Sequence, residues 1–399
     1  MKPQGLVLLL TLLFASKPFA QNTLTVASWN IEWFGSASNG PADDNLQEAN
    51  VKTVLRYLNA DIYGLVEVVD TMRFRRVVDS LGTNYKYVIA DFCSNNTTGT
   101  GNSWLTGQKE AYIYNKNIFN NVKVRGMMRN SNTAYSNYAS GRFPYLLNAD
   151  VTKNGVTRNI NFILIHGKSG STQSDYDKRK GATQELKDTL DAFFANQNII
   201  IVGDYNDALN TTICTSCTSQ LSSYDPLIKD SAHFKSITMP LALAGQTTMI
   251  NYPNVIDNHV VSVPMNSFYV ANSVQIRIDA TALIPNYQSN NTSDHYPVTS
   301  KYNFTGTTTA IPTVTASQLK VSFYPNPFAA QLNIAFGKTL TNVQLQLSDV
   351  QGKILVTQQY NRIAEGSTLK PWFSNLAKGI YFLGIATADY QTVIKLVKL

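Results

Sequence analysis

Short apolar runs alternate with amphipathic stretches between residues 24 and 301, and this alternation restricts the fold more than any other feature. Several runs are continuously apolar, as in strands that are covered on both faces of a sheet. Residues 46–58 and 182–194 have apolar side chains at helical spacing. Strands covered by helices predict an α/β sandwich. The predicted strands are 24–29, 62–66, 111–114, 160–165, 199–202 and 255–263.

The composition changes near residue 304. The segment that follows, up to residue 318, is mostly Thr, Gly, Ala and Pro, which is typical of a linker. Beyond it, apolar and polar positions alternate, for example over 343–347, and no helical segment of note is present. We therefore predict a first domain over 21–304, a linker over 305–318 and a small all-β sandwich over 319–399.

The first twenty residues have the three parts of a secretory signal. Lys2 precedes an apolar run over 6–15, and small residues near Ala20 provide a cleavage site. The run is short for a membrane span, so an uncleaved anchor is the less favoured alternative. No other stretch is long and apolar enough for a span, and we expect no stable membrane insertion.

The net charge of +7 does not by itself identify a nucleic-acid binder, because of where the charges lie. Residues 1–20 carry two lysines, and residues 319–399 carry eight basic against three acidic residues, which leaves residues 21–318 neutral. A basic group remains in the first domain, and a substrate surface and an ordinary solvated face explain it equally well. Its members are Lys109, Lys116, Lys123, Arg125, Arg129 and Arg142.

Three cysteines cannot all form disulfides within the chain. Cys214 and Cys217 lie close together in a stretch rich in Thr and Ser, so a local disulfide is favoured in an exported chain and leaves Cys93 free. Pairing of Cys93 with either of the others is the alternative. Two cysteines without nearby histidines do not provide a structural zinc site.

Polar side chains gather at the ends of the predicted strands. Three of the four histidines, His166, His259 and His295, follow or lie within strand-like runs, whereas His233 is isolated and expected on the surface. Carboxylates at strand ends bind hard cations, and histidines held by carboxylates transfer protons. Any one of these features commonly reflects a solvated strand end, so their combination carries the argument for catalysis.

Five segments, in chain order, resemble the motifs of the endonuclease/exonuclease/phosphatase superfamily. They are Ser28-Trp29-Asn30-Ile31-Glu32, Asp61-Ile62-Tyr63-Gly64-Leu65-Val66-Glu67, Gly203-Asp204-Tyr205-Asn206, Ile256-Asp257 with Val260-Val261-Ser262, and Ser293-Asp294-His295. The resemblance covers about residues 24–303. It implies a four-layered α/β sandwich of the DNase I-like type, followed by the small all-β domain.

The resemblance also implies a role for each matching residue. His295, held by Asp257, is expected to be the general base, and His166 the general acid or a donor to the phosphate. The expected cation is Mg²⁺, with Mn²⁺ and Ca²⁺ as alternatives. His259 has no role in the resemblance and is expected to be structural. The implied catalytic residues are His166, His295, Asp257, Glu110, Asp204 and Asn206, the substrate-binding residues are Arg142 and Asn30, and the metal ligands are Glu67, Glu32 and Asp294.

Two further segments are similar to DNase I-like nucleases in particular. Lys109-Glu110-Ala111-Tyr112 resembles a segment whose Glu supports a catalytic histidine, here His166. Gly141-Arg142-Phe143-Pro144-Tyr145 resembles a segment whose Arg binds a substrate phosphate. The chain departs from those nucleases at Gln108, where they have Tyr, and in an extended loop over residues 171–180. These departures bear on groove contacts and sequence preference.

The C-terminal residues have a resemblance of their own. Phe323-Tyr324-Pro325-Asn326-Pro327-Phe328, Asp349-Val350-Gln351-Gly352-Lys353 and Leu376-Ala377-Lys378-Gly379-Ile380-Tyr381 resemble motifs of the sorting domain of the type IX secretion system of Bacteroidota. The resemblance implies export to the periplasm and transfer across the outer membrane, with release or attachment at the cell surface. An ordinary β-sandwich binding module, for example for carbohydrate, is the alternative.

These observations predict a secreted, metal-dependent phosphodiesterase, and in the leading interpretation a DNase I-like endonuclease. A lipid phosphodiesterase or phosphatase of the sphingomyelinase type is the main alternative, because the superfamily shares its core between such substrates. A non-catalytic surface-binding protein is disfavoured, since each matched position holds a chemically competent residue. The expected partners are nucleic acid as substrate and the type IX secretion machinery, and we expect a monomer.

Overall fold

The computed structural model describes residues 23–288, 291–304, 320–350, 354–370, 376–387 and 391–399. The chain divides into two compact units, Met1–Thr305 and Gly306–Leu399. The predicted signal segment 1–20 and the predicted linker 305–318 lie outside the described residues.

Two six-stranded sheets form the centre of the first unit. The first sheet has the order β11-β12-β1-β2-β4-β3, and the second has the order β5-β6-β7-β8-β10-β9. The first sheet contains β1 (Thr23–Phe34), β2 (Ile62–Val68), β3 (Tyr85–Ile89), β4 (Lys109–Asn115), β11 (Gln275–Ile276) and β12 (Val298–Asn303). The second contains β5 (Phe119–Gly126), β6 (Tyr145–Lys153), β7 (Val156–His166), β8 (Ile199–Asp204), β9 (Phe234–Ser236) and β10 (Asp257–Ser262).

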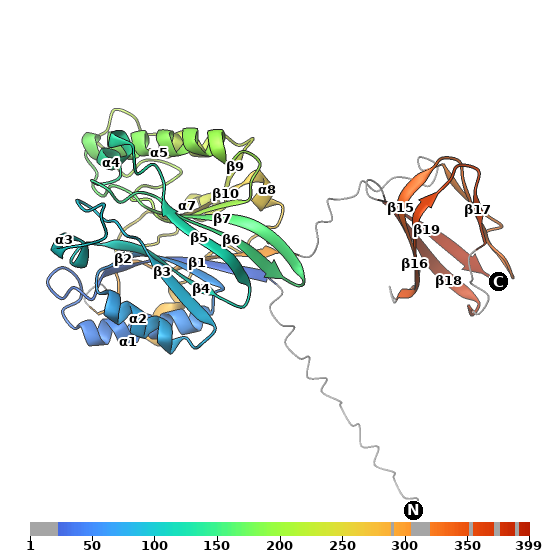
Figure 1. Ribbon diagram of the computed structural model, residues 1–399, viewed down its shortest axis with the longest axis horizontal. Coiled ribbons are helices and arrows are strands. Elements are labelled where there is room, and N and C mark those ends of the chain that lie inside the picture. The colour runs from blue at the N-terminus through green and yellow to red at the C-terminus, as the bar shows by residue number, and fades with distance from the viewer. Residues whose placement is uncertain (1–22, 289–290, 305–319, 351–353, 371–375, 388–390) are drawn as a thin grey trace, which may run out of the picture. The chain divides into compact units, whose positions relative to one another are not determined.

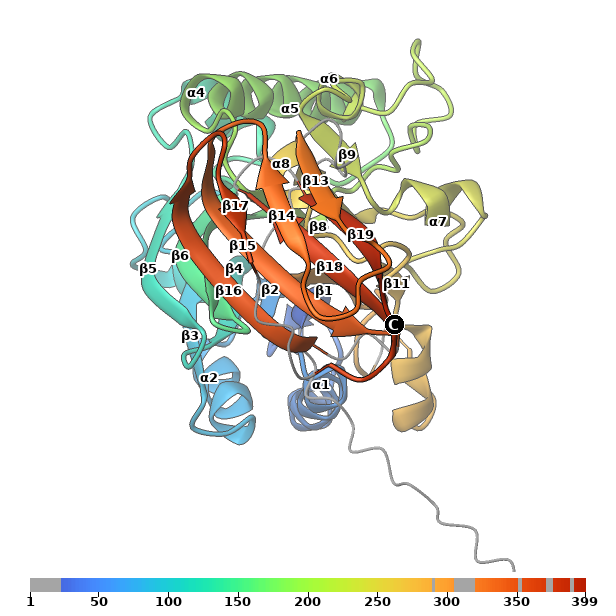
Figure 2. The ribbon, with the colours of Figure 1, turned by 90° about the vertical axis from the view of Figure 1, so that its right-hand side faces the viewer.

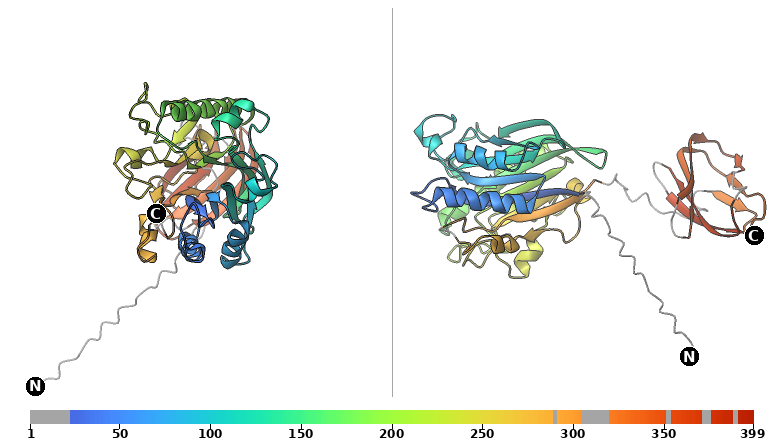
Figure 3. Two further views of the ribbon diagram at one scale, coloured as in Figure 1. Left: turned by 90° about the vertical axis from the view of Figure 1, so that its left-hand side faces the viewer. Right: turned by 90° about the horizontal axis from the view of Figure 1, so that it is seen from below.

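Helices cover the outer faces of both sheets. Figure 1 shows α1 and α2 below the sheets and α4 and α5 above them, and Figure 3 shows α1 and α2 side by side in blue. These layers confirm the predicted four-layered α/β sandwich. The helices are α1 (Asp44–Leu58), α2 (Thr71–Ser80), α3 (Asn102–Leu105), α4 (Asn132–Asn137), α5 (Gln173–Phe193), α6 (Asp225–Ile228), α7 (Met239–Leu243), α8 (Val263–Asn266) and the 3₁₀ helix η1 (Ile278–Leu283).

The strand directions bring distant parts of the sequence to one edge of the sandwich. In each sheet two central strands are parallel, β1 with β2 and β7 with β8, so their C-terminal ends lie together. Their neighbours β4, β10 and β12 run antiparallel to them and therefore begin at the same edge. Residues that end one set of strands and residues that precede the other set consequently meet.

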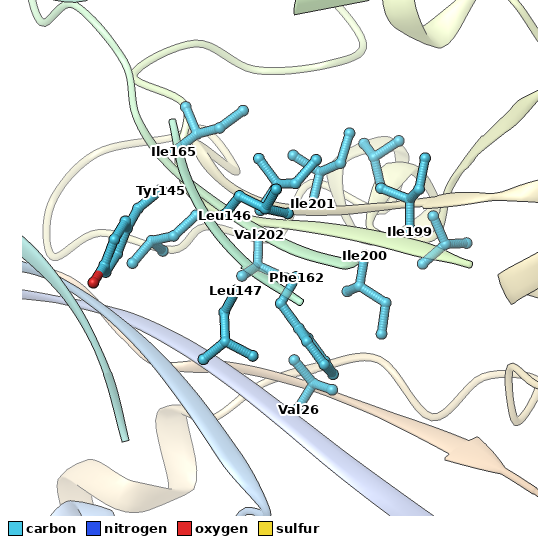
Figure 4. Packing of buried hydrophobic residues seen from close by; sticks show 14 of the residues in the cluster. Val26, Tyr145, Leu146, Leu147, Phe162, Ile165, Ile199, Ile200, Ile201 and Val202 are labelled. Atoms are coloured by element: carbon cyan, nitrogen blue, oxygen red, sulfur yellow. The ribbon is translucent and has the colours of Figure 1, made fainter. Parts of the chain in front are cut away.

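Apolar side chains fill the space between the two sheets. Figure 4 shows Val26 of the first sheet beside Phe162 and Leu147 of the second. Ile200 and Val202 face this layer with them, whereas the outer face of the second sheet packs on α5. The run 199–202 is therefore buried on both faces, as its continuous apolar sequence predicts.

Helix α5 begins nine residues earlier than the sequence predicts. Residues 173–180, expected to extend a loop, form its first turns. Thr172 and Asp175 make a capping box there, in which each side chain contacts the main chain of the other. The helical pattern was hidden because one of the two buried positions in these turns is a charged residue, Arg179, which is 1% exposed.

The loop between β8 and α6 contains the predicted local disulfide. Cys214 is bonded to Cys217, and Cys93 is free and buried. Both bonded cysteines pack with Tyr176 of α5. The disulfide therefore closes a loop that lies against the start of this helix.

The second unit consists of two antiparallel sheets that enclose one apolar core. Its strands are seen most clearly in Figure 2. The arrangement confirms the predicted all-β sandwich. One sheet contains β13 (Val321–Tyr324), β14 (Asn333–Phe336) and β17 (Thr368–Leu369), and the other contains β16 (Ile354–Ile363), β15 (Leu340–Asp349), β18 (Gly379–Ala386) and β19 (Gln391–Lys398).

His259 joins the two sheets of the first unit within their core. It lies in β10, and its ring nitrogens are 3.0 Å from the hydroxyl of Ser28 in β1 and 2.9 Å from that of Ser300 in β12. The residue is completely buried. Burial lowers its pKa to about 3. These contacts agree with a structural role for this histidine.

Acid is expected to destabilise the first unit through His259. The unfolded chain takes up a proton at this residue below about pH 6.5, whereas the folded protein takes it up only near pH 3. The free energy of unfolding therefore falls as the pH decreases from about 6.5, by about 2 kcal/mol at pH 5. Urea unfolding of the wild-type chain and of His259→Gln at pH 7.5 and pH 5 tests this. The difference in the free energy of unfolding between the two proteins should be smaller at pH 5 than at pH 7.5. A difference that does not change with pH would contradict the lowered pKa of His259.

Candidate active site

A polar cleft lies at the edge where the central strands end. Its volume is about 370 Å³. It collects side chains from both sheets and from the loops that precede β4, β6 and β12. The described residues that line it are Asn30, Glu32, Trp33, Asn39, Glu67, Gln108, Arg142, His166, Ser169, Asp204, Asn206, Met249, Asp294 and His295.

Nine of the eleven residues singled out from the sequence line this cleft. The other two, Asp257 and Glu110, lie behind it and are at most 2% exposed. His233 lies elsewhere, with its side chain 62% exposed and its ring beside Asp230. Lys109, which was grouped with a possible basic surface, is buried and donates to the carbonyl oxygens of residues 104, 105 and 107. Arg142 of the same group is also buried.

His295 and Asp257 form a buried pair. The Nδ1 atom of His295 lies 2.7 Å from Oδ2 of Asp257, which leaves Nε2 directed to the cleft. The carbonyl oxygen of His295 accepts hydrogen bonds from Trp29 and Tyr287, which hold the backbone that carries the ring. Burial by itself would lower the pKa of His295, but the charges of Asp257 and then Asp204 raise it well above 6.5. The surrounding carboxylates therefore favour the protonated imidazole.

His166 has the opposite electrostatic environment. Its pKa lies well below 6.5, because of burial first and then the positive charge of Arg142. The Nη1 atom of Arg142 is 3.1 Å from both ring nitrogens, which point in different directions, so this contact is made to the ring face rather than along either lone pair. Arg142 also donates to the oxygens of Gly167 and Gln108. His166 is therefore neutral at pH 7.

The Glu110 carboxylate makes no hydrogen bond to the ring of His166. Burial raises the pKa of Glu110 well above its usual range, against the nearby charge of Arg142. The carboxylate lies close to His166 all the same, because the backbone N–H of that residue also acts on it and lowers its pKa. The residue in contact with the His166 ring is Arg142, which comes from the loop before β6.

Asp204 lies between the two histidines. Its Oδ2 atom is 3.8 Å from Nε2 of His166 and 3.8 Å from Nε2 of His295. The amide of Asn30 donates to Asp204 at 3.1 Å and to Glu67 at 3.0 Å and links the two carboxylates. Burial raises the pKa of Asp204 to about 6. Two imidazoles, one at the end of β7 and one in the loop before β12, thus face the same carboxylate oxygen.

Four residues at this edge have backbone angles that residues other than glycine rarely adopt. Glu32, Trp33, Glu67 and Asn206 have φ values between 45° and 67°. Such conformations cost energy and are kept where the surrounding structure enforces them, commonly at functional sites. The bulge at the end of β1 and the turn at the end of β2 therefore direct side chains into the cleft at the expense of local stability.

The donors at this edge fit a divalent cation. Ligand atoms of Asp204, Asp257 and His295 lie within 4.8 Å of one another. Glu67 and Asp294 add further carboxylates to the cleft, and hard cations prefer oxygen ligands. Asp257 Oδ1 is buried and has no hydrogen-bond partner among the described residues. The other oxygen of Asp257 is already engaged by His295, so the predicted ligands Glu67, Glu32 and Asp294 are the more accessible set.

Sequence reasoning missed several residues of the cleft. Trp33 follows a motif residue directly, so its position in the motif was the available signal. Asn39, Ser169 and Met249 lie on loops, where no periodic pattern marks them. Met249 reaches the cleft because its main chain pairs with that of His295.

Comparisons with known proteins were made for the sequence and for the fold. Residues 322–399 match the family model "Secretion system C-terminal sorting domain". No match was found among curated proteins. Among the described residues, no helix is long and apolar enough to cross a membrane.

Three solved structures illustrate the similarity of fold. An endonuclease/exonuclease/phosphatase from Beutenbergia cavernae is 17% identical with a TM-score of 0.49, and the match covers 94% of this chain and 100% of that one. One from Bacteroides vulgatus is 13% identical with a TM-score of 0.48, covering 70% and 98%. A mannosyl-6-phosphatase from Bacteroides thetaiotaomicron is 14% identical with a TM-score of 0.44, covering 69% and 98%. Similarity at this level carries no conclusion about activity or substrate.

The family match assigns the second unit a role in export. A secretion system C-terminal sorting domain directs the chain through the type IX system to the cell surface or the medium. The chain thus joins a sandwich with the architecture expected of the endonuclease/exonuclease/phosphatase superfamily to a secretion system C-terminal sorting domain.

Proposed function

We propose that the first unit is a divalent-metal-dependent phosphodiesterase that acts as a DNase I-like endonuclease on nucleic acid. One observation carries the proposal: His166 and His295 both lie 3.8 Å from the same carboxylate oxygen of Asp204, in a polar cleft that also contains Arg142. Hydrolysis of a phosphodiester needs proton transfer on both sides of the phosphorus and cations around it. The cleft has a residue for each of these tasks.

His295 is the side chain suited to exchange a proton with the attacking water at Nε2. Asp257 holds its Nδ1 atom, fixes the tautomer and stabilises the imidazolium. The carboxylates around His295 raise its pKa, so a cation that neutralised part of their charge would favour its action as a base. Neutral His166 donates a hydrogen bond from the opposite side, toward the phosphate or the leaving oxygen.

The remaining residues bind and orient the phosphate. Arg142 provides planar donors for a non-bridging oxygen, and Asn30 and Asn206 provide amides beside Asp204. Glu67, Glu32 and Asp294 would hold Mg²⁺, which suits their oxygen donors, with Mn²⁺ or Ca²⁺ as alternatives. When bound, the cation would neutralise charge on the phosphate and on the departing oxygen.

The lining of the cleft supports nucleic acid over lipid as the substrate. Twelve of the fourteen lining residues are polar or charged, and only Trp33 and Met249 among them are apolar. A site for a lipid would be expected to expose a larger apolar surface next to the chemistry. Phosphate and sugar contacts in nucleic-acid complexes come mainly from Arg, Asn, Gln and Ser side chains of the kind found here.

A substrate panel with the full chain tests the proposal. Plasmid DNA, RNA and sphingomyelin are incubated separately with Mg²⁺, with Mn²⁺, with Ca²⁺ and with EDTA. We expect plasmid nicking that EDTA abolishes and added Mg²⁺ restores, because a bound cation would neutralise the charge that develops on the departing oxygen during cleavage. Cleavage of sphingomyelin without cleavage of plasmid would support the lipid enzyme instead. Nicking that persists in EDTA would contradict the metal requirement.

A further inference from the structure

Two tryptophans lie four residues apart in β1, and the structure uses them differently. Trp29 is buried and donates its indole N–H to the carbonyl oxygen of His295 at 2.9 Å. Trp33 is partly exposed and lines the cleft. Its indole makes no hydrogen bond or ring contact with any residue that the structure describes. The fold thus leaves one large aromatic side chain uncommitted beside the candidate active site.

The backbone of Trp33 is held in place from two sides. Its N–H donates to Oε2 of Glu67 at 2.9 Å. The buried amide of Gln47, from α1, donates to the carbonyl oxygens of Ile31 and Glu32 at 2.9 and 2.8 Å. These bonds stabilise the left-handed conformations of Glu32 and Trp33, at φ values of 45° and 46°. The direction in which the indole leaves the backbone is therefore fixed by the same bulge that positions the carboxylates.

The turn over residues 36–40 supports this bulge from outside. The N–H of Ser36 donates to the carbonyl oxygen of Trp33 at 2.9 Å. A Cβ atom at Gly40 would lie 2.7 Å from the oxygen of Glu32 and 2.9 Å from Cβ of Trp33, so the turn packs closely there. A side chain whose attachment is held this firmly loses little entropy when a ligand covers it.

We propose that the indole of Trp33 stacks on the nucleobase next to the scissile phosphate and so makes the enzyme prefer substrates that carry a base there. The inference rests on the proposed nuclease function and names the substrate group that the site recognises. Trp33 lines the same cleft as His166, His295 and Arg142, so a base stacked on its indole would adjoin a phosphate bound there. Base stacking on an aromatic side chain tolerates every base, because each has a flat face. The scarcity of other apolar side chains in the cleft fits one flat ring better than an acyl chain.

Dinucleotides test the proposal on the full chain. One carries both bases, and two others lack the base on the 5′ or the 3′ side of the phosphate. We expect the wild-type kcat/KM to fall about 5- to 100-fold for one of the two abasic forms, as for loss of one stacked base. Trp33→Leu should lower kcat/KM for the complete dinucleotide by a similar factor. Its kcat/KM should then be the same for the complete dinucleotide and for that abasic form. Trp33→Phe, which keeps an aromatic face, should restore most of the difference.

Binding without turnover provides a second measurement. Oligothymidylate added in EDTA should quench tryptophan fluorescence in the wild type. The quenching should disappear in Trp33→Leu, although Trp29, Trp104 and Trp372 remain as emitters. Met249→Leu, which changes the other apolar residue of the cleft without adding or removing a ring, should retain it.

Two outcomes would overturn the proposal. If Trp33→Leu lowered kcat/KM equally for the complete and the abasic dinucleotides, the residue would only support the fold. An unchanged quenching signal in Trp33→Leu would show that no base covers the indole. Failure of the proposed function would give another result, because the wild type would then cleave neither plasmid nor any dinucleotide with any cation. The quenching experiment would still test whether a base stacks on Trp33.

Discussion

Replacing His295 by alanine is expected to lower kcat for plasmid cleavage by at least about 10²- to 10³-fold. This is the effect expected when an enzyme loses a group that transfers a proton in the reaction. Nε2 of His295 is directed to the cleft, 3.8 Å from Asp204, and the pKa of the other histidine among the described lining residues, His166, is shifted in the opposite direction. Initial rates of supercoil loss at saturating Mg²⁺ measure the effect. Circular dichroism checks that the variant is folded.

A matched control uses the same substitution at an exposed position. His233→Ala removes an imidazole that is 62% exposed and pairs with Asp230, away from the cleft, so its cleavage rate should stay within about twofold of the wild type. Asp257→Asn should lose activity in the same direction as His295→Ala, because it no longer fixes the tautomer or stabilises the imidazolium. Normal turnover by a folded His295→Ala would remove this residue from the proposed chemistry.

Arg179→Met is expected to lower the free energy of unfolding by about 3–5 kcal/mol, as for breaking a buried ion pair from one side. The side chains of Arg179 and Asp207 are both 0% exposed, with 3.7 Å between their charged groups. Without the guanidinium, the Asp207 carboxylate remains buried without a charged partner. Urea unfolding at pH 7.5 measures the change.

The pair also joins two segments of the candidate site. Arg179 donates to the carbonyl oxygens of Lys168 and Gly170, just after His166. Asp207 accepts hydrogen bonds from Ser223 and from the N–H of Ile213, and so orders the disulfide-containing loop after Asn206. The lower stability of Arg179→Met should therefore be accompanied by a lower rate of plasmid cleavage.

Two further variants separate the ion pair from general effects of losing arginine. Arg75→Met removes an arginine that is 63% exposed, and its effect should stay within about 0.5 kcal/mol. In the double variant Arg179→Met with Asp207→Asn the losses should be less than additive, because no charge is left unpaired. Strict additivity would mean that the two residues act independently, contrary to their contact.

Much of the candidate site followed from the sequence because its residues occupy strand ends. An apolar run that is buried on both faces marks a central strand locally, and the residue at its end must lie at an edge of the sheet. His166 and Asp204 follow such runs, so their positions were predictable one strand at a time. The parallel pairing of β7 with β8 then places these two residues opposite each other.

Other contacts were not predictable, because they join residues that no local pattern relates. Gln47 holds the bulge that directs Trp33, and Arg179 is buried only because Asp207 and nearby carbonyl oxygens lie around it. The first turns of α5 were assigned to a loop for this reason. A charged residue at a core position breaks the apolar pattern that sequence reasoning depends on.

The sequence by itself determined the α/β and all-β parts of the chain and the residues that gather at one edge, because burial patterns and strand ends are local properties. Only the tertiary structure decided how those residues interact. It placed Arg142 rather than Glu110 against the ring of His166, and it gave His166 and His295 opposite proton affinities. The physical reason is that pKa values depend on desolvation and on charges within a few ångströms, and the fold brings those charges together from segments that are distant in the chain.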